Sequence, residues 1–330
     1  MTIVHRPGLK RRQLLLAAAA SGAPLARAAS PIADGRPITL VVSYPAGGGA
    51  DLMARLIAPH MSAALGQTVV VDNKPGASGQ LAANQVARAK PDGASLLLDA
   101  SSFAVNPSLF PKLPYDTDTA FTPLAVLALY PNVLVCAPGF EAKNVKDVLR
   151  MARAKPRQLA YASSGNGSAQ HLAGALFEQQ AGVEMLHVPY RGGGPALNDV
   201  MAGQVPLFFA NVASSLGIIQ SGRLRPLAVT SRLRCRALPD VPTMEEAGVP
   251  RYEVQECNPV LGPAGLPAAT KSALQAAIRA AMAEPEVLGR VRSLGGDLFP
   301  DNSDAAVGAY LKAQRTLWAR IVRERRISLE

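Results

Sequence analysis

Two glycine-rich loops carry the residue types in this sequence that are best suited to hold an anion. Gly47, Gly48 and Gly49 follow a short apolar run at 38–42. The segment Ser-Ser-Gly-Asn-Gly-Ser at 163–168 follows a similar run. Glycine has no Cβ, so the backbone N–H groups of such loops can approach a ligand closely. A helix that begins directly after the loop adds free amides and the positive end of its dipole. The two loops therefore predict an anion-binding site.

Ser168 and His171 offer a different chemistry, that of a serine nucleophile and its base. No Gly-x-Ser-x-Gly elbow surrounds Ser164 or Ser168, however, and Ser168 is well placed to cap a helix that contains His171. We therefore expect His171 to order the loop through a side-chain hydrogen bond. Asp51 is interpreted first as a helix cap and second as a ligand contact. No Lys-Ser/Thr pair follows the glycines at 47–49, which argues against a nucleotide phosphate loop.

The elements that must position these loops alternate between strands and helices. Strands are predicted at 38–42, 69–71 and 96–98, with helices near 51–65 and 80–89 between them. This βαβ pattern predicts an open parallel sheet, in which ligands bind beyond the carboxyl ends of the strands. Ser101 lies in such a position, just after the third strand.

The second half of the chain repeats the order of strand, glycine-serine loop and helix at 158–179. Further strands are predicted at 126–129, 133–136, 185–188, 207–210 and 227–230. The proline-containing segments 103–123 and 260–267 are predicted to be irregular, and a capping box at 243–246 predicts a short helix. The last helix should begin near Ser303 and hold the only tryptophan, Trp318.

Length and composition are those of a globular protein with two domains of ordinary size. The chain has 330 residues, of which 48% are hydrophobic and 18% charged. The formal net charge is +10, but five of the basic residues lie at 1–28, where there is no acid. Aromatic residues make up only 5%, which is poor for base stacking. Nucleic acid is therefore not expected as a partner.

The first 28 residues are predicted to be an export signal. Basic residues at 10–12 precede an apolar stretch at 14–20, and Ala-Arg-Ala at 26–28 suits a signal peptidase. The Arg-Arg pair at 11–12 resembles a twin-arginine signal, with Sec export as the alternative. The apolar stretch is too short to span a bilayer. The mature protein is therefore predicted to be soluble and periplasmic.

Taken in order, several segments resemble the tripartite tricarboxylate transporter substrate-binding proteins, also called the Bug family. They are Tyr-Pro-Ala-Gly-Gly-Gly-Ala-Asp at 44–51, Val-Asp-Asn-Lys-Pro-Gly-Ala-Ser-Gly at 71–79, Ser-Gly-Asn-Gly-Ser-Ala-Gln-His-Leu at 164–172, Val-Pro-Tyr-Arg-Gly-Gly-Gly-Pro-Ala at 188–196, and shorter matches at 225–231, 239–243 and 246–248. The resemblance implies an α/β, two-lobed type II periplasmic-binding-protein fold with two hinge crossover strands. Lobe 1 would comprise residues 29–133 and 238–330, and lobe 2 residues 134–237. The hinge strands would be 133–136 and 227–230.

The resemblance also implies a small organic acid as ligand, held through one carboxylate by amides and hydroxyls of both lobes. The residues that would contact it are Tyr44, Ala46, Gly47, Gly48, Gly49, Asp51, Ser78, Ser101, Ser164, Gly165, Asn166, Gly167, Ser168, His171, Arg191 and Asn211. The implied protein is monomeric, has no cofactor and no catalytic residue, and delivers its ligand to the subunits of a membrane permease. The alternatives are a ligand sensor for a receptor kinase and, less favoured, a serine hydrolase.

Two departures from the family pattern and the cysteines complete the expectations. Pro206 replaces a usual aspartate, and Glu-Cys-Asn at 256–258 replaces a segment that often holds an aromatic residue. Both positions are expected to face the variable end of the ligand. The sequence has three cysteines, Cys136, Cys235 and Cys257, interpreted as small buried side chains. The implied lobe boundaries place Cys136 and Cys235 near each other, which suggests a disulfide between them.

Overall fold

The computed structural model describes residues 2, 32, 35–324 and 327. The predicted export signal at 1–28 lies outside the described residues except for position 2. None of the described helices combines the length and the apolarity that a bilayer crossing requires.

The first part of the chain confirms the predicted βαβ pattern. Strands β1 (Ile38–Val42), β2 (Val69–Asn73) and β3 (Ser95–Leu98) pair in parallel in the order β2-β1-β3. Helices α2 (Gly49–Leu65) and α3 (Gln80–Ala87) connect them, with the short helix η2 (Ala77–Gly79) before α3. The apolar side chains of β1 are buried because helices cover both faces of the sheet.

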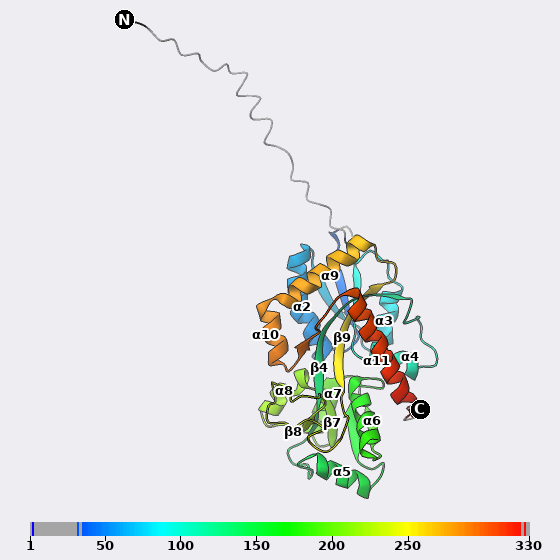
Figure 1. Cartoon of the computed structure of the whole chain (residues 1–330), viewed down its shortest axis with the longest axis vertical. Helices are drawn as coiled ribbons and strands as arrows, with labels where there is room; N and C mark the ends of the chain where they lie inside the picture. Colours follow the sequence, from blue (N-terminus) through cyan, green and yellow to red (C-terminus); the bar gives the residue numbers. More distant parts are fainter. Residues whose placement is uncertain (1, 3–31, 33–34, 325–326, 328–330) are drawn as a thin grey trace. The chain divides into compact units, whose positions relative to one another are not determined.

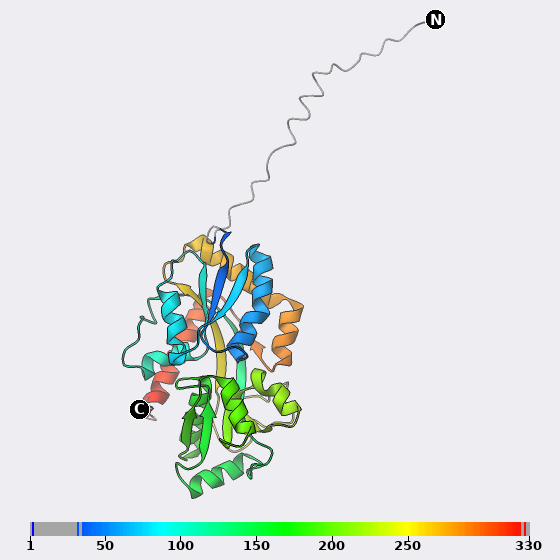
Figure 2. The same cartoon turned by 180° about the vertical axis from the view of Figure 1, so that it is seen from behind.

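A long strand, β4 (Phe121–Cys136), links two groups of strands (Figures 1 and 2). It pairs antiparallel with β9 (Gln255–Pro263) and the short β10 (Asp297–Leu298) on one side of the molecule, and with β7 (Leu207–Asn211) and β8 (Arg225–Val229) on the other. β9 also pairs with β3, while β5 (Ala160–Ser163) runs parallel to β7 and to β6 (Leu186–Pro189). The strand order is β2-β1-β3-β9-β4-β7-β5-β6.

Because β4 and β9 contain prolines, the sequence did not indicate that each is one continuous strand. The segments predicted as separate strands at 126–129 and 133–136 belong to the single strand β4, and half of the predicted loop at 260–267 is the end of β9. The β4–β9 ladder shifts register twice, between Pro123 and Ala125 and between Val126 and Leu129. These irregularities let proline, which lacks an N–H donor, sit inside the paired strands.

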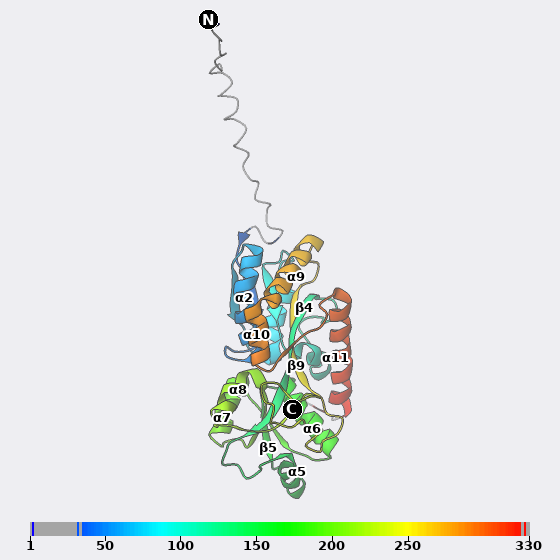
Figure 3. The same cartoon turned by 60° about the vertical axis from the view of Figure 1, so that its left-hand side comes forward.

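Helices cover both faces of the sheet and enclose separate cores. The remaining helices are α4 (Ser102–Leu109), α5 (Val145–Ala154), α6 (Ala169–Ala181), α7 (Gly193–Met201), α8 (Val212–Gln220), α9 (Ala268–Ala283), α10 (Pro285–Ser293) and α11 (Asp304–Glu324). Around β1–β3, one core holds side chains of α2, α9 and α10, and another holds those of α3, α4 and α11. Figure 3 shows α2 and α10 on one side of β4 and β9, and α11 on the other. Around β5–β8, α5 and α6 contribute to one core, and α7 and α8 to another.

Helix α11 connects the two groups of strands on one side of the molecule. Val307 and Leu311 pack near α3 and α4, whereas Trp318 and Ile321 belong to the core around α5 and α6. The prediction that the last helix begins near Ser303 and carries the tryptophan is confirmed. Trp318 is only 1% exposed, so the helix is fixed to both groups of strands by apolar contacts.

Two smaller predictions were wrong. α4 forms within the segment expected to be irregular, although Pro107 lies inside it and cannot donate a hydrogen bond to the preceding turn. The capping box at 243–246 does form, with Thr243 N–H donating to Glu246 Oε2 at 2.8 Å and Glu246 N–H donating to Thr243 Oγ1 at 3.1 Å. It closes a turn rather than opening a helix.

The disulfide suggested between Cys136 and Cys235 is absent: all three cysteines are free and buried. Cys136 Sγ lies against the carbonyl oxygens of Ala142 and Arg225, whereas Cys235 Sγ lies against that of Gly295. The two side chains belong to different cores, which keeps their sulfurs apart.

Candidate functional site

The first glycine loop joins β1 to α2 and is held in shape by Asp51. Gly47 N–H donates to Asp51 Oδ2 at 2.9 Å, and Gly47 has a positive φ of 82°, a conformation that glycine adopts readily. Asn73 Nδ2 donates to the other carboxylate oxygen at 3.0 Å, and Arg55 pairs with the same group. Burial alone would raise the pKa of Asp51, but these bonds together lower it. Asp51 therefore holds the first glycine loop in its conformation. The N-cap residue of α2 is Gly48, so no N-cap side chain binds the first amides of the helix.

The second glycine loop joins β5 to α6 and is held by Ser168 and His171. Ser168 Oγ accepts from His171 N–H at 3.2 Å and donates to the carbonyl oxygen of Gly165 at 2.7 Å. Gly167 N–H donates to His171 Nδ1 at 3.2 Å. This confirms that Ser168 caps the helix and that His171 orders the loop. Ser168 and His171 are occupied by these bonds and make no nucleophile–base contact with each other.

A second histidine, His187, stacks against His171. The His171 and His187 rings stack with centroids 3.9 Å apart, and His187 Nε2 lies 2.6 Å from Ser163 Oγ. Burial lowers the pKa of His171 to about 4. Burial, and then the neighbouring His171, lower the pKa of His187 to about 2. Both rings are therefore neutral around pH 7 and act as a rigid support for the loop.

The loop after β3 is tied together by a buried acid. Asp99 Oδ1 accepts from Ser43 Oγ at 2.5 Å, from Ala100 N–H at 2.7 Å and from Ser102 Oγ at 2.9 Å. Burial raises the pKa of Asp99 to about 6, although these bonds oppose the rise. Ser101 Oγ accepts from Cys257 N–H at 3.1 Å and thereby connects this loop to β9.

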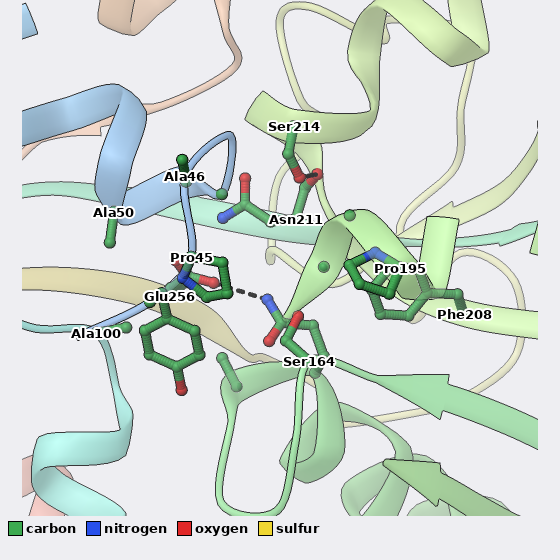
Figure 4. A pocket seen from close by; sticks show the side chains of 17 residues that line it. Pro45, Ala46, Ala50, Ala100, Ser164, Pro195, Phe208, Asn211, Ser214 and Glu256 are labelled. Atoms are coloured by element: carbon green, nitrogen blue, oxygen red, sulfur yellow. Dashed lines mark hydrogen bonds between the residues drawn. The ribbon is translucent and has the colours of Figure 1, made fainter. Parts of the chain in front are cut away.

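A small cavity of about 40 Å³ lies where the two glycine loops meet (Figure 4). It is lined by Tyr44, Pro45, Ala46, Gly48, Gly49, Ala50, Ala100, Ser164, Ala169, Gln170, Gly193, Gly194, Pro195, Phe208, Asn211, Ser214 and Glu256. These residues include the first turns of α2, α6, α7 and α8. Because each helix start carries partial positive charge, the cavity favours a negatively charged ligand group.

A larger open cleft of about 600 Å³ shares Tyr44, Pro45 and Ser164 with the cavity. Ser78 Oγ donates to the carbonyl oxygen of Asn166 at 2.7 Å, which connects one side of this cleft to the other. Arg191 lines the same cleft and supplies positive charge beside the route to the cavity. We therefore regard the cleft as the entrance.

The structure separates the predicted contact residues into three groups. Tyr44, Ala46, Gly48, Gly49, Ser164 and Asn211 line the cavity. Tyr44 and Ser164 also line the cleft, together with Ser78, Gly165, Asn166 and Arg191. Gly47, Asp51, Ser101, Gly167, Ser168 and His171 line neither hollow, and the bonds described above make them supports of the loops.

Several lining residues were not among the predicted contacts. Gly193 and Gly194 open α7 after a third glycine loop, and this run of glycines before a helix was a usable signal. Phe208 and Ser214 follow no local pattern that indicates a site. Of the two departures noted in the sequence, Glu256 lines the cavity, whereas Pro206 lines neither hollow.

Glu256 is buried and is held by a neighbouring amide. Its Oε2 accepts from Gln170 Nε2 at 2.7 Å, and the same amide group donates to Asn132 Oδ1 at 3.1 Å. Figure 4 marks the bond to Glu256 with a dashed line. Burial raises the pKa of Glu256, and the bond from Gln170 offsets the rise only in part.

Comparison with known proteins identifies the family. The model of the tripartite tricarboxylate transporter family receptor matches residues 53–327. The chain belongs to this receptor family. A solved structure of Rhodopseudomonas palustris Rpa4515 with adipate is 34% identical over 89% of this chain and 98% of that one, with a TM-score of 0.85. The structure of the periplasmic binding protein BugD is 34% identical over the same shares, with a TM-score of 0.84.

A third solved relative is MatC (Rpa3494) of Rhodopseudomonas palustris with bound malate. It is 30% identical to the receptor over 87% of this chain and 99% of that one, with a TM-score of 0.83. The α/β fold of the receptor is thus that of periplasmic binding proteins, as its resemblance implied. The family consists of substrate-binding proteins and not of enzymes, which confirms the prediction that the chain does not catalyse a reaction.

Proposed function

We propose that this receptor captures a small carboxylate in the small cavity between the glycine loops and delivers it to a membrane permease of the tripartite tricarboxylate type. The observation that carries the proposal is the convergence of four helix starts and two glycine loops on one cavity. Amide donors in this arrangement stabilise a carboxylate without a buried cation. The relatives solved with adipate and malate support the same class of ligand.

Two lobes would close on the ligand, with residues 29–133 and 238–330 in one and 134–237 in the other. The hydrogen bond between Ser78 and Asn166 would cross from one proposed lobe to the other. The bond between Gln170 and Glu256 also joins the two. Closure over the ligand would exclude water and strengthen the bonds to its carboxylate.

Export to the periplasm and delivery to a permease complete the proposal. The family description and the periplasmic relative support both. Cell fractionation, with N-terminal sequencing of the mature protein, tests the export. Recovery of the full-length chain from the cytoplasm would contradict it. Loss of ligand uptake in a strain lacking this receptor, restored by its return, tests the delivery.

The binding test uses one substitution that enters the cavity and one that does not. A methyl group at Gly49 would lie 3.1 Å from Asn211 Nδ2 and 3.2 Å from Glu256 Oε1, whereas one at Gly289 of α10 would meet nothing within 4 Å. Both glycines are helical, so each Gly→Ala change keeps its helix. A calorimetric screen should first identify ligands among mono-, di- and tricarboxylates, amino acids and aromatic acids.

We expect Gly49→Ala to weaken binding of the best ligand at least about tenfold, equivalent to about 1.4 kcal/mol, and Gly289→Ala to leave its affinity unchanged. A ligand at a hundredfold excess over its Kd should also stabilise the folded protein by about 2.7 kcal/mol. If no organic acid binds, or if both variants bind like the wild type, the assignment of this cavity fails.

A further inference from the structure

We propose that Glu256 selects a ligand that carries a cationic group, such as an ammonium, in addition to its carboxylate. This inference rests on the proposed function, because it concerns the ligand of the same cavity.

The charge of the cavity wall is the first argument. Among the described residues that line the cavity, Glu256 is the only Asp, Glu, Lys, Arg or His. It is 6% exposed, and its Oε1 lies at the start of α2, where it would be 3.2 Å from a methyl group at Gly49. The ligand therefore meets one fixed acidic group and no basic side chain inside the cavity.

The balance between helix starts and Glu256 is the second argument. Each helix start contributes about half a positive charge, so the four of them supply about +2. Glu256 in its ionised form reduces this to about +1, which one ligand carboxylate neutralises. A second carboxylate would then lie beside Glu256 as an uncompensated like charge, whereas an ammonium would form a pair with it.

A free acceptor beside Glu256 is the third argument. Asn211 is 5% exposed, and both its Oδ1 and its Nδ2 are buried without a hydrogen-bond partner among the described residues. Its amide lies at the start of α2 with Glu256, since a methyl group at Gly49 would be 3.1 Å from Asn211 Nδ2. An ammonium has three donors and no acceptor, so it suits Glu256 and Asn211 Oδ1 together.

The test compares ligands in which an ammonium replaces a carboxylate or a hydroxyl at the same position. The probe pairs are 3-aminopropanoate with succinate, 4-aminobutyrate with glutarate, 5-aminopentanoate with adipate, and alanine with lactate. Each is titrated by calorimetry into wild-type protein, Glu256→Gln and Glu253→Gln at pH 7.5. Glutamine keeps an oxygen that can accept from Gln170. Glu253 is a matched control, since its side chain is 48% exposed and it does not line the cavity.

In the wild type and in Glu253→Gln, the best amino acid of these pairs should bind about 10- to 100-fold more tightly than its partner, the range expected for a buried charge-assisted bond. Glu256→Gln should abolish or reverse this ratio. A preference for the diacids in the wild type, or a ratio unchanged in Glu256→Gln, overturns the inference.

The outcomes separate this inference from the proposed function. Binding of succinate, glutarate or adipate without their amino partners refutes the role of Glu256 and leaves carboxylate capture intact. If no carboxylate of any kind binds, the proposed function fails and this inference fails with it. Thermal unfolding checks that Glu256→Gln folds. Should it not fold, the wild-type affinity ratios decide, together with proton uptake on binding, which is measured by calorimetry in two buffers. A diacid that binds only when Glu256 becomes protonated would show such an uptake.

Discussion

Acid should weaken this protein through the stacked rings of His171 and His187. Both side chains are held neutral: burial lowers the pKa of His171 to about 4, and burial together with His171 lowers that of His187 to about 2. In the unfolded chain each ring has a pKa of about 6.5. Between these values the unfolded state binds protons that the folded state does not bind. The free energy of unfolding must therefore decrease as the pH falls through this range.

The size of the effect follows from the pKa differences. For a histidine that titrates near 6.5 when unfolded and below 5 when folded, lowering the pH from 7.5 to 5 removes about 2 kcal/mol of stability. The pair should therefore remove about 4 kcal/mol. Asp99 acts in the opposite sense, because its pKa is raised to about 6 and the folded state binds its proton first as the pH falls. The wild-type curve thus contains both contributions, and a variant is needed to separate them.

Urea unfolding at pH 7.5 and pH 5 of wild type, His187→Gln and His60→Gln makes the separation. His187→Gln removes one titrating ring while Asp99 and His171 remain. Its loss of stability between the two pH values should be about 2 kcal/mol smaller than that of the wild type. His60, whose side chain is 25% exposed, lies outside the stacked pair, and its substitution should reproduce the wild-type loss. An equal loss in His187→Gln and wild type would show that the stacked pair does not resist protonation.

Three further predictions concern the cores and the first loop. Trp318→Ala should lower the free energy of unfolding by about 3–5 kcal/mol in urea titrations, because a fully buried indole leaves a large void; no loss would mean that α11 is not packed as described. A thiol reagent should modify the three cysteines of the native protein only slowly and react with all three after unfolding in the absence of reductant; a missing thiol would indicate a disulfide. Asp51→Asn should weaken ligand binding about tenfold, because asparagine cannot accept from Gly47 N–H, Arg55 and Asn73 as the carboxylate does. Asp72→Asn, at a half-buried position of β2 that lines neither hollow, should leave calorimetric affinities unchanged.

The parts of the fold that could be predicted are those specified by neighbouring residues. β1, the glycines at 47–49 and α2 form one continuous pattern of apolar run, flexible loop and helix, and β5 to α6 repeats it. Ser168 caps its helix through an atom three residues from His171 N–H, so its role was also visible locally. The N-terminal sheet followed because alternating short strands and helices favour parallel pairing.

The parts that could not be predicted depend on contacts between distant residues. β9 contains Pro259 and Pro263, which locally indicate a loop, and it becomes a strand because β3 and β4 lie on either side of it. Gln170 gave no signal of its own, since its bond to Glu256 spans 86 positions. The departure at Glu256 could be noted in the sequence, but its place in the cavity wall requires the folded sheet.

The size of the cavity shows what binding must change. About 40 Å³ has room for a few water molecules but not for a four-carbon acid, so ligand entry has to part contacts that now cross the site. One is the neutral bond between Ser78 and Asn166, and another is the bond from Gln170 to Glu256. Their net contributions are about 1 kcal/mol for the neutral bond and about 1.5–3 kcal/mol for the bond to the acid. A micromolar Kd corresponds to about 8 kcal/mol of net binding free energy, so the ligand's own contacts must exceed that figure by the cost of parting these bonds.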